Sequence, residues 1–228
     1  MDTKNTTRVA LVTGGSAGLG LALTTALAEA GWHVITDGRS AEKFKEADLA
    51  DGVTTIVGDL TDADHREDLR VEVERHGRLD LLVHNASTLG PLPMKALADV
   101  DIADLTQVWR TNIGGPLVLT STLLPWLREA DGVLLSISSD AAVNHYETWG
   151  LYGASKAALD HVTLTYAAET GLTAYAVDPG DMRTAMHQDA FPGEDISDRP
   201  LPEIVVPHLL ALLEARPEPG RYKAEDYR

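Results

Sequence analysis

The chain has 228 residues and no cysteine, and 19 lysine and arginine residues against 35 aspartate and glutamate residues give it a formal net charge of −16. So acidic a balance argues against nucleic acid or an anionic membrane as the main partner. Without cysteine, disulfides, thiolate catalysis and cysteine-ligated metals are excluded, so catalytic groups must be oxygen or nitrogen acids and bases.

Short apolar runs alternate along the chain with longer segments of helical periodicity. The runs predict buried parallel strands over residues 9–13, 33–37, 53–58, 79–84, 132–138 and 173–178. Apolar residues at helical spacing predict helices over 19–30, 62–76, 102–128, 152–169 and 203–215. The alternation favours an α/β fold, a doubly wound parallel sheet with helices on both faces, and we expect one domain over residues 1–228.

Three segments depart from this pattern. Gly114-Gly115-Pro116 would ordinarily break a helix, so we expect a bend within 102–128. Residues 186–202 contain FPG and RPLP and predict a loop. Residues 220–223 are expected to add a short strand at the edge of the sheet.

The N-terminal segment MDTKNTTR, residues 1–8, is polar and leads into the apolar run at 9–12. This run is too short for the core of a signal peptide or for a membrane span. A cytoplasmic location is therefore expected.

A glycine-rich turn, TGGSAGLG at residues 13–20, directly follows the first predicted strand and opens the first predicted helix. Glycines let the backbone approach a pyrophosphate, and the amides at the start of a helix stabilise its charge. The spacing of Gly14, Gly18 and Gly20 differs from the common dinucleotide fingerprint. It resembles the T-G-x-x-x-G-x-G turn of the short-chain dehydrogenase/reductase family, which implies a single Rossmann-like domain.

The end of the second strand reads Asp37-Gly38-Arg39-Ser40. In such folds an acidic residue here binds the ribose 2′-hydroxyl of NAD, whereas arginine favours the 2′-phosphate of NADP. In the family the acidic position corresponds to Gly38, and Arg39 follows it, so we expect NADP(H) as the preferred cofactor and NAD(H) as the alternative. Two observations weigh against this: the charge of Asp37 would oppose a phosphate if it points inward, and Ala17 stands where many NADP-preferring relatives have a basic residue. The alternative for Arg39 is a solvated turn residue.

Tyr152 and Lys156 share one face of a predicted helix, one turn apart. A cation beside a phenol favours the phenolate and brings its pKa toward the range useful for proton transfer. The pair alone is common on ordinary helix surfaces, so its context decides.

Two further positions complete a resemblance to the catalytic residues of the family. Ser139 lies 13 residues before Tyr152, at the family's separation, and alternation along the strand leaves only one of Ser138 and Ser139 facing the site. Asn112 matches the fourth catalytic residue of the family. Its non-catalytic alternative is a buried asparagine that hydrogen-bonds the backbone at the helix bend. The resemblance implies that Asn112, Ser139, Tyr152 and Lys156 are catalytic.

The remaining motifs extend the resemblance over roughly four-fifths of the chain. Gly58-Asp59-Leu60 matches the adenine-binding turn, although Asp59 could instead cap a helix. The sequence HNAS at residues 84–87 stands where the family usually has N-N-A-G, and DPGDMRT at 178–184 matches P-G-x-x-x-T. The implied cofactor contacts are Gly14, Ser16, Gly18, Leu19, Gly20, Arg39, Asp59, Leu60, Asn85, Ala86, Tyr152, Lys156, Pro179, Gly180, Met182 and Thr184.

The activity implied by this resemblance is an NADP(H)-dependent oxidoreductase that interconverts a carbonyl and a secondary alcohol. Tyr152 would be the general acid or base, Ser139 would hold the substrate oxygen, Lys156 would bind the nicotinamide ribose, and Asn112 would hold a water that restores the proton. Epimerisation or dehydration by the same residues, and a catalytically silent NADP(H)-sensing protein, are the alternatives.

The substrate is expected to be a small organic molecule bound by the segments around the catalytic residues. His145, Tyr146, Trp149 and Met186 are the candidate contacts, although a loop histidine is more often solvated. Metal binding is not expected, because the histidines lack ligand spacing. A homodimer through the two long helices, 102–128 and 152–170, is expected, with a tetramer as the alternative.

Overall fold

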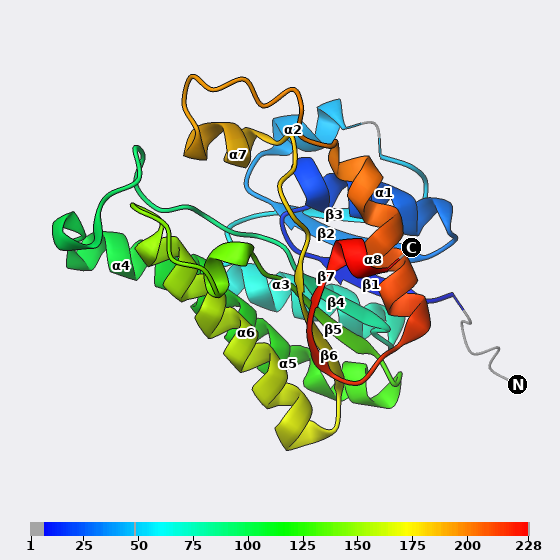
Figure 1. Ribbon diagram of the computed structural model, residues 1–228. Helices are drawn as coiled ribbons and strands as arrows, with labels where there is room; N and C mark the ends of the chain where they lie inside the picture. The colour runs from blue at the N-terminus through cyan, green and yellow to red at the C-terminus, as the bar shows by residue number, and fades with distance from the viewer. Residues whose placement is uncertain (1–6, 48, 228) are drawn as a thin grey trace, which may run out of the picture.

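The computed structural model describes residues 7–47 and 49–227. The first six residues, which carry most of the prediction for the N-terminal segment, lie outside this part of the chain. Within it, one layer of strands lies between two layers of helices (Figure 1).

All seven strands of the sheet run parallel, in the order β3-β2-β1-β4-β5-β6-β7. The strands are β1 (Val9–Val12), β2 (His33–Gly38), β3 (Val53–Val57), β4 (Leu81–His84), β5 (Val133–Ile137), β6 (Thr173–Asp178) and β7 (Gly220–Lys223). The predicted doubly wound sheet and its short edge strand are confirmed. The strand order reverses between β1 and β4, where open α/β sheets bind their ligands.

The α-helices of the described chain include all five that the sequence predicts. They are α1 (Gly18–Glu29), α2 (Ala41–Glu46), α3 (Ala63–His76), α4 (Ile102–Trp109), α5 (Gly115–Glu129), α6 (Gly150–Thr170), α7 (Ala185–Ala190) and α8 (Pro202–Ala215). The expected bend within 102–128 is confirmed as a π-helical turn, Arg110–Gly114, between α4 and α5.

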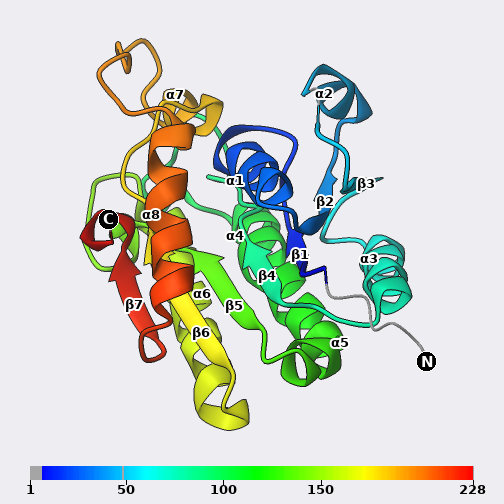
Figure 2. The same ribbon diagram turned by 90° about the vertical axis from the view of Figure 1, so that its right-hand side faces the viewer.

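Both faces of the central strand β1 are buried. Ala10 and Val12 belong to an apolar cluster with α1 and α8, whereas Val9 and Leu11 pack on the opposite face with α3 and α5. Figure 2 shows α1 and α8 on one side of the sheet and α3, α5 and α6 on the other. Two-sided burial explains why the strands read as apolar runs without alternation.

Two short helices were not predicted from the sequence. The helix α2 begins after Ser40, whose hydroxyl accepts a hydrogen bond from the Lys43 amide, and α7 begins after Thr184, which caps it in the same way. The prediction that residues 186–202 form a loop is thus wrong at its start, because the Thr184 cap nucleates a helix that spacing alone did not reveal. Both helices lie at the same end of the molecule (Figures 1 and 2).

No helix in the described part of the chain is long and apolar enough to span a membrane.

Candidate active site

A cavity of about 490 Å³ lies at the carboxyl ends of the strands, where the strand order reverses. Segments that follow β1 to β6 line it. Among the residues singled out in the sequence, Gly20, Asn112, His145 and Tyr146 are outside its lining. Those that line it are Gly14, Ser16, Gly18, Leu19, Arg39, Asp59, Leu60, Asn85, Ala86, Ser139, Trp149, Tyr152, Lys156, Pro179, Gly180, Met182, Thr184 and Met186.

The glycine turn after β1 is held by side chains from neighbouring strands. Asn85 Nδ2 donates to the carbonyl oxygens of Thr13 and Gly14, at 2.9 and 3.2 Å. Gly14 has a φ of 71°, and a Cβ at Gly20 would lie 2.3 Å from the Gly14 oxygen, so both positions need glycine. Ala17, at the N-cap of α1, makes no side-chain hydrogen bond to the helix. The first backbone amides of α1, which lie at the cavity, therefore have no side-chain cap. A pyrophosphate fits such a helix terminus.

The carboxylate of Asp37, the residue that weighed against NADP(H), is engaged within the protein. Its Oδ1 accepts from the Gly14 amide at 2.7 Å, and its Oδ2 lies 3.0 Å from His65 Nε2. Asp37 and His65 are both buried. Asp37 therefore shapes the glycine turn, and hydrogen-bond donors already occupy both of its oxygens.

Arg39 and Lys43 bring two exposed cations to the adenosine end of the cavity. Partial burial raises the pKa of nearby Asp59. Hydrogen bonds from Thr61 and the charge of Arg39 together lower it by more, so the net shift of the pKa is downward. The sequence did not single out Lys43, because α2 was not predicted. Together, Arg39 and Lys43 provide the positive charge that a 2′-phosphate needs.

Tyr152 and Lys156 are both buried on α6, with Lys156 Nζ 5.6 Å from the centre of the Tyr152 ring. Burial raises the pKa of Tyr152 above its ordinary value, and hydrogen bonds with Ser87 and Ser139 lower it only partly. Burial also lowers the pKa of Lys156 to about 8, and its Nζ donates to the Ile137 oxygen at 2.8 Å. The expected lowering of the Tyr152 pKa by Lys156 is not found, because desolvation of the phenol dominates the shift.

Ser138 and Ser139 both line the cavity, but their hydroxyls have different partners. Ser138 Oγ donates to Asp160 Oδ2 at 2.8 Å, whereas Ser139 Oγ donates to Asp140 Oδ1 at 3.2 Å. Of the two, Ser139 is the one that lowers the pKa of the Tyr152 phenol, so its hydroxyl is assigned to the phenol.

Asn112 lies in the π-helical turn and is fully buried. Its Oδ1 accepts from the Thr88 amide at 2.9 Å and from Ser87 Oγ at 3.3 Å, and its Nδ2 donates to the Thr88 oxygen and to Ser155 Oγ, both at 2.9 Å. The side chain thus joins α6 to the segment after β4, with all its hydrogen-bonding groups in use.

The departures from N-N-A-G at residues 84–87 cause no backbone strain. Positive φ angles of non-glycine residues in the described chain fall at Asp131, Thr148 and Arg216, so Ser87 has an ordinary backbone. His84 is buried with Nε2 2.6 Å from Thr120 Oγ1, and burial lowers its pKa to about 3, with a further contribution from Lys156. His84 is therefore neutral in the physiological range and adds no charge beside Lys156.

Arg221, a charged residue that the sequence did not reveal as part of the site, contacts the backbone of Ser139. Arg221, on β7, donates from Nη2 to the Ser139 oxygen at 2.8 Å and from Nε to Asp160 Oδ2 at 3.0 Å. Its Nη2 also lies 3.6 Å from Asp178 Oδ2. Asp160 is one turn beyond Lys156 and could have been noticed by spacing, but only the pairing of β6 with β7 brings Arg221 to it.

The substrate side of the cavity is apolar. Leu89 and Tyr152 form a small buried cluster against which Trp149 and Met186 pack, and the rings of Trp149 and Tyr152 meet edge to face with centres 5.8 Å apart. The other two candidate contacts lie elsewhere: His145 is exposed, and the hydroxyl of the exposed Tyr146 donates to Asp140 Oδ2 at 2.6 Å.

Comparisons with known proteins show the family to which the chain belongs. The model of the short chain dehydrogenase family matches residues 8–195. An uncharacterized oxidoreductase of Saccharomyces cerevisiae is 33% identical over 186 residues, which make up 78% of this chain and 72% of the relative. A benzil reductase ((S)-benzoin forming) of the same yeast is 31% identical over 195 residues, 80% of this chain and 74% of the relative. The solved structure of a short chain dehydrogenase from Shigella flexneri complexed with NADP is 28% identical, has a TM-score of 0.87, and covers 96% of this chain and 97% of its own.

Proposed function

Because the chain is an oxidoreductase of the short chain dehydrogenase family, we propose that it interconverts a carbonyl and a secondary alcohol with NADP(H) as its cofactor. One observation carries the proposal: the Ser139 and Tyr152 hydroxyls line the same cavity as the glycine turn. A proton donor and an oxygen-binding hydroxyl beside a dinucleotide turn suit the reduction of a carbonyl.

The residues present fit the cofactor at two of its charged groups. The uncapped start of α1 would hold the pyrophosphate, and Arg39 with Lys43 would hold the 2′-phosphate of NADP(H). The engagement of Asp37 by Gly14 and His65 supports the same choice, because that carboxylate is not free to oppose a phosphate. The NADP bound by the related Shigella flexneri protein is a further argument.

The reaction would divide between the cofactor and the side chains. NADP(H), when bound, supplies or accepts the hydride. In a reduction, Tyr152 gives its hydroxyl proton to the oxygen that was the carbonyl oxygen, and Ser139 donates a hydrogen bond to that oxygen. The charge of Lys156 stabilises the phenolate that remains. This electrostatic effect is stronger because the lysine is buried and poorly solvated. In the oxidising direction Tyr152 is the base.

The substrate would be an apolar ketone, whose reduction gives a secondary alcohol. Trp149, Leu89 and Met186 offer apolar surface next to the two hydroxyls, so an aryl or branched group could lie on them while the carbonyl points at Tyr152. The name of the related benzil reductase supports including aromatic diketones among the candidates.

The test is a screen for substrate-dependent loss of NADPH absorbance with ketones, aldehydes and benzil, using the parent, Tyr152→Phe and the matched variant Tyr166→Phe on the same helix. Tyr152→Phe should lower kcat about a hundredfold or more, while Tyr166→Phe should retain it. Turnover by Tyr152→Phe at the parental rate would overturn the mechanism. NADPH binding without turnover of any carbonyl would instead favour the sensing alternative, and product formation without net NADPH consumption would favour epimerisation or dehydration.

A homodimer through α4, α5 and α6 is part of the proposal. Ile102 on α4 is 75% exposed, and Leu117 and Val118 on α5 are 40% and 44% exposed. Apolar side chains on adjoining helices favour burial against a second copy. Light scattering after size exclusion should return the mass of two chains; a monomer or tetramer mass would contradict this. The single domain over 1–228 and the cytoplasmic location stay predictions.

A further inference from the structure

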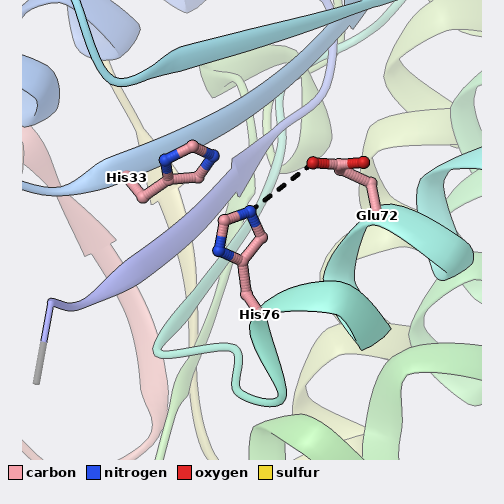
Figure 3. Close-up of side chains that lie close together, drawn as sticks. All are labelled: His33, Glu72 and His76. Carbon is pink, nitrogen blue, oxygen red and sulfur yellow. Dashed lines mark ion pairs between the residues drawn. The ribbon is translucent and has the colours of Figure 1, made fainter. Parts of the chain in front are cut away.

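Outside the active site, two histidines and a glutamate come together between β2 and α3. His33 opens β2, whereas Glu72 and His76 lie one turn apart near the end of α3. One potential ligand atom from each residue lies within 4.8 Å of the other two. Figure 3 shows the three side chains converging from the strand and the helix. None of them lines the active-site cavity.

The spacing within the cluster is close to that of a metal centre. His76 Nε2 and Glu72 Oε1 are 3.5 Å apart, and the centres of the His33 and His76 rings are 4.0 Å apart. Two ligand atoms about 2.1 Å from a tetrahedral zinc ion would be separated by about 3.4 Å. The helix pair therefore already has this separation, and a ligand atom of His33 lies within 4.8 Å of both.

Burial favours ligation over simple solvation. The side chains of Glu72 and His76 are only 14% and 17% exposed, so solvent reaches little of either ligand.

Neighbouring groups orient the cluster. Thr54 Oγ1 lies 3.1 Å from His33 Nε2 and fixes the ring, while Arg75 donates to Glu72 Oε2 at 2.7 Å and leaves Oε1 toward His76. Hydrogen bonds of this kind position the ligands in metal sites. The cluster also lies at the carboxyl end of α3, where the helix dipole favours a cation.

We propose that His33, Glu72 and His76 bind one divalent transition-metal ion of the zinc class, with water completing the coordination. Imidazole with a single carboxylate suits zinc, cobalt, nickel or copper rather than magnesium or calcium. At its other end α3 is already tied to β2 by His65 and Asp37, 3.0 Å apart. The metal would join α3 to β2 a second time, at the carboxyl end of the helix, so its role is structural.

The experiment uses full-length, untagged protein stripped with a chelator, with Zn²⁺ as the titrant and Co²⁺ as a spectroscopic probe. One equivalent of Zn²⁺ should bind, saturating Zn²⁺ should raise Tm by about 5 °C, and Co²⁺ should show visible absorption bands of a low-coordinate nitrogen-oxygen site. His76→Gln and His33→Gln should each weaken Zn²⁺ binding at least tenfold, whereas the exposed His161→Gln should leave it unchanged.

If a histidine variant fails to fold, Zn²⁺ affinity is measured in Glu72→Gln, which preserves side-chain size and should also bind the ion more weakly. Equal Zn²⁺ affinity in the parent and in the cluster variants would overturn the proposal, as would the absence of stoichiometric binding. Loss of binding in His161→Gln alone would overturn it too, because the ion would then lie elsewhere.

Discussion

Arg221, on the last strand of the sheet, donates from Nε to Oδ2 of Asp160 on α6 at a distance of 3.0 Å. The same guanidinium donates to the Ser139 carbonyl oxygen at 2.8 Å. It therefore links the helix that carries Tyr152 and Lys156 to the backbone of the serine beside the phenol. Burial raises the pKa of Asp160, while hydrogen bonds from Ser138 and Arg221 act to lower it, so this cation offsets part of the cost of burying the carboxylate.

Arg221→Met should lower kcat about tenfold with little change in the KM for NADPH, because Ser139 loses a backbone anchor while the cofactor contacts remain. It should also cost about 2 kcal/mol of stability, since Asp160 is left buried without its cation. Arg221→Lys should restore part of kcat, because lysine can serve one of the two acceptors but not both. Steady-state kinetics and denaturant unfolding check this; a stability loss with an unchanged kcat would reduce Arg221 to a purely structural residue.

The site shows which contacts a sequence can predict. The glycine turn is contiguous, and Tyr152 and Lys156 lie on one helix turn, so local spacing was enough to place them together. Strand alternation predicted that only one of Ser138 and Ser139 faces the site, whereas both line the cavity and differ in their hydrogen-bond partners. Arg221 and Asp160 are 61 residues apart in the sequence, and their ion pair depends on where the edge strand lies in the sheet. No local sequence pattern predicts such a contact.

The same reasoning explains the other omissions. Lys43 was missed because α2 is a single short capped helix, and His33 meets His76 only through the packing of α3 on β2. The pKa of Tyr152 was expected to fall because a neighbouring cation can be read from spacing, whereas the opposing effect of burial depends on the whole fold.

Gly20→Ala should disrupt the glycine turn. The added Cβ would lie 2.3 Å from the Gly14 oxygen and 2.4 Å from Asn85 Nδ2, so the backbone must shift, at a cost of about 2 kcal/mol and with at least tenfold weaker NADPH binding. Gly114→Ala is the matched control: Gly114 has a helical φ of −62°, and its Cβ would meet only the Trp109 oxygen at 3.6 Å. Thermal unfolding and NADPH titration compare the two, and a tolerated Gly20→Ala would contradict the assigned packing.

Arg39→Ala and Lys43→Ala should each raise the KM for NADPH about tenfold and leave the KM for NADH nearly unchanged, because only the former cofactor carries the 2′-phosphate. The loss should shrink in high salt, since both side chains are exposed. Lys45→Ala, on the same short helix but absent from the cavity lining, is the control. Equal effects on both cofactors would place the two cations elsewhere than at the 2′ position.

Ser139→Ala and Ser138→Ala should separate catalysis from stability. Removing the Ser139 hydroxyl, which is beside Tyr152, should lower kcat about a hundredfold, as loss of an oxygen-binding donor does in other enzymes. Removing the Ser138 hydroxyl should cost about 1 kcal/mol, because Asp160 loses a donor at 2.8 Å, and should change kcat by less than about threefold. Kinetics and unfolding of both variants decide the matter; a larger kcat loss in Ser138→Ala would reverse the assignment.

Lys156→Met should stabilise the protein at neutral pH while abolishing activity. Burial lowers the pKa of Lys156 to about 8 from an ordinary 10.5, so between these values the unfolded chain binds more protons and stability rises with pH. Below pH 8 the full penalty applies, about 3 kcal/mol for a shift of this size. Methionine removes this penalty but also the hydrogen bond to the Ile137 oxygen, worth about 1 kcal/mol, which leaves a net gain of about 2 kcal/mol.

The gain from Lys156→Met should vanish as pH rises through 8 toward 10.5, because the parent then loses its buried charge on its own. Urea unfolding of the parent and the variant at neutral pH and near pH 10 measures the difference, in which the other titrating groups cancel. A variant that is less stable than the parent at neutral pH would mean that the Lys156 charge is well solvated or paired in the folded protein. The low pKa would then be wrong, and with it the argument that a weakly solvated cation stands ready to stabilise the Tyr152 phenolate.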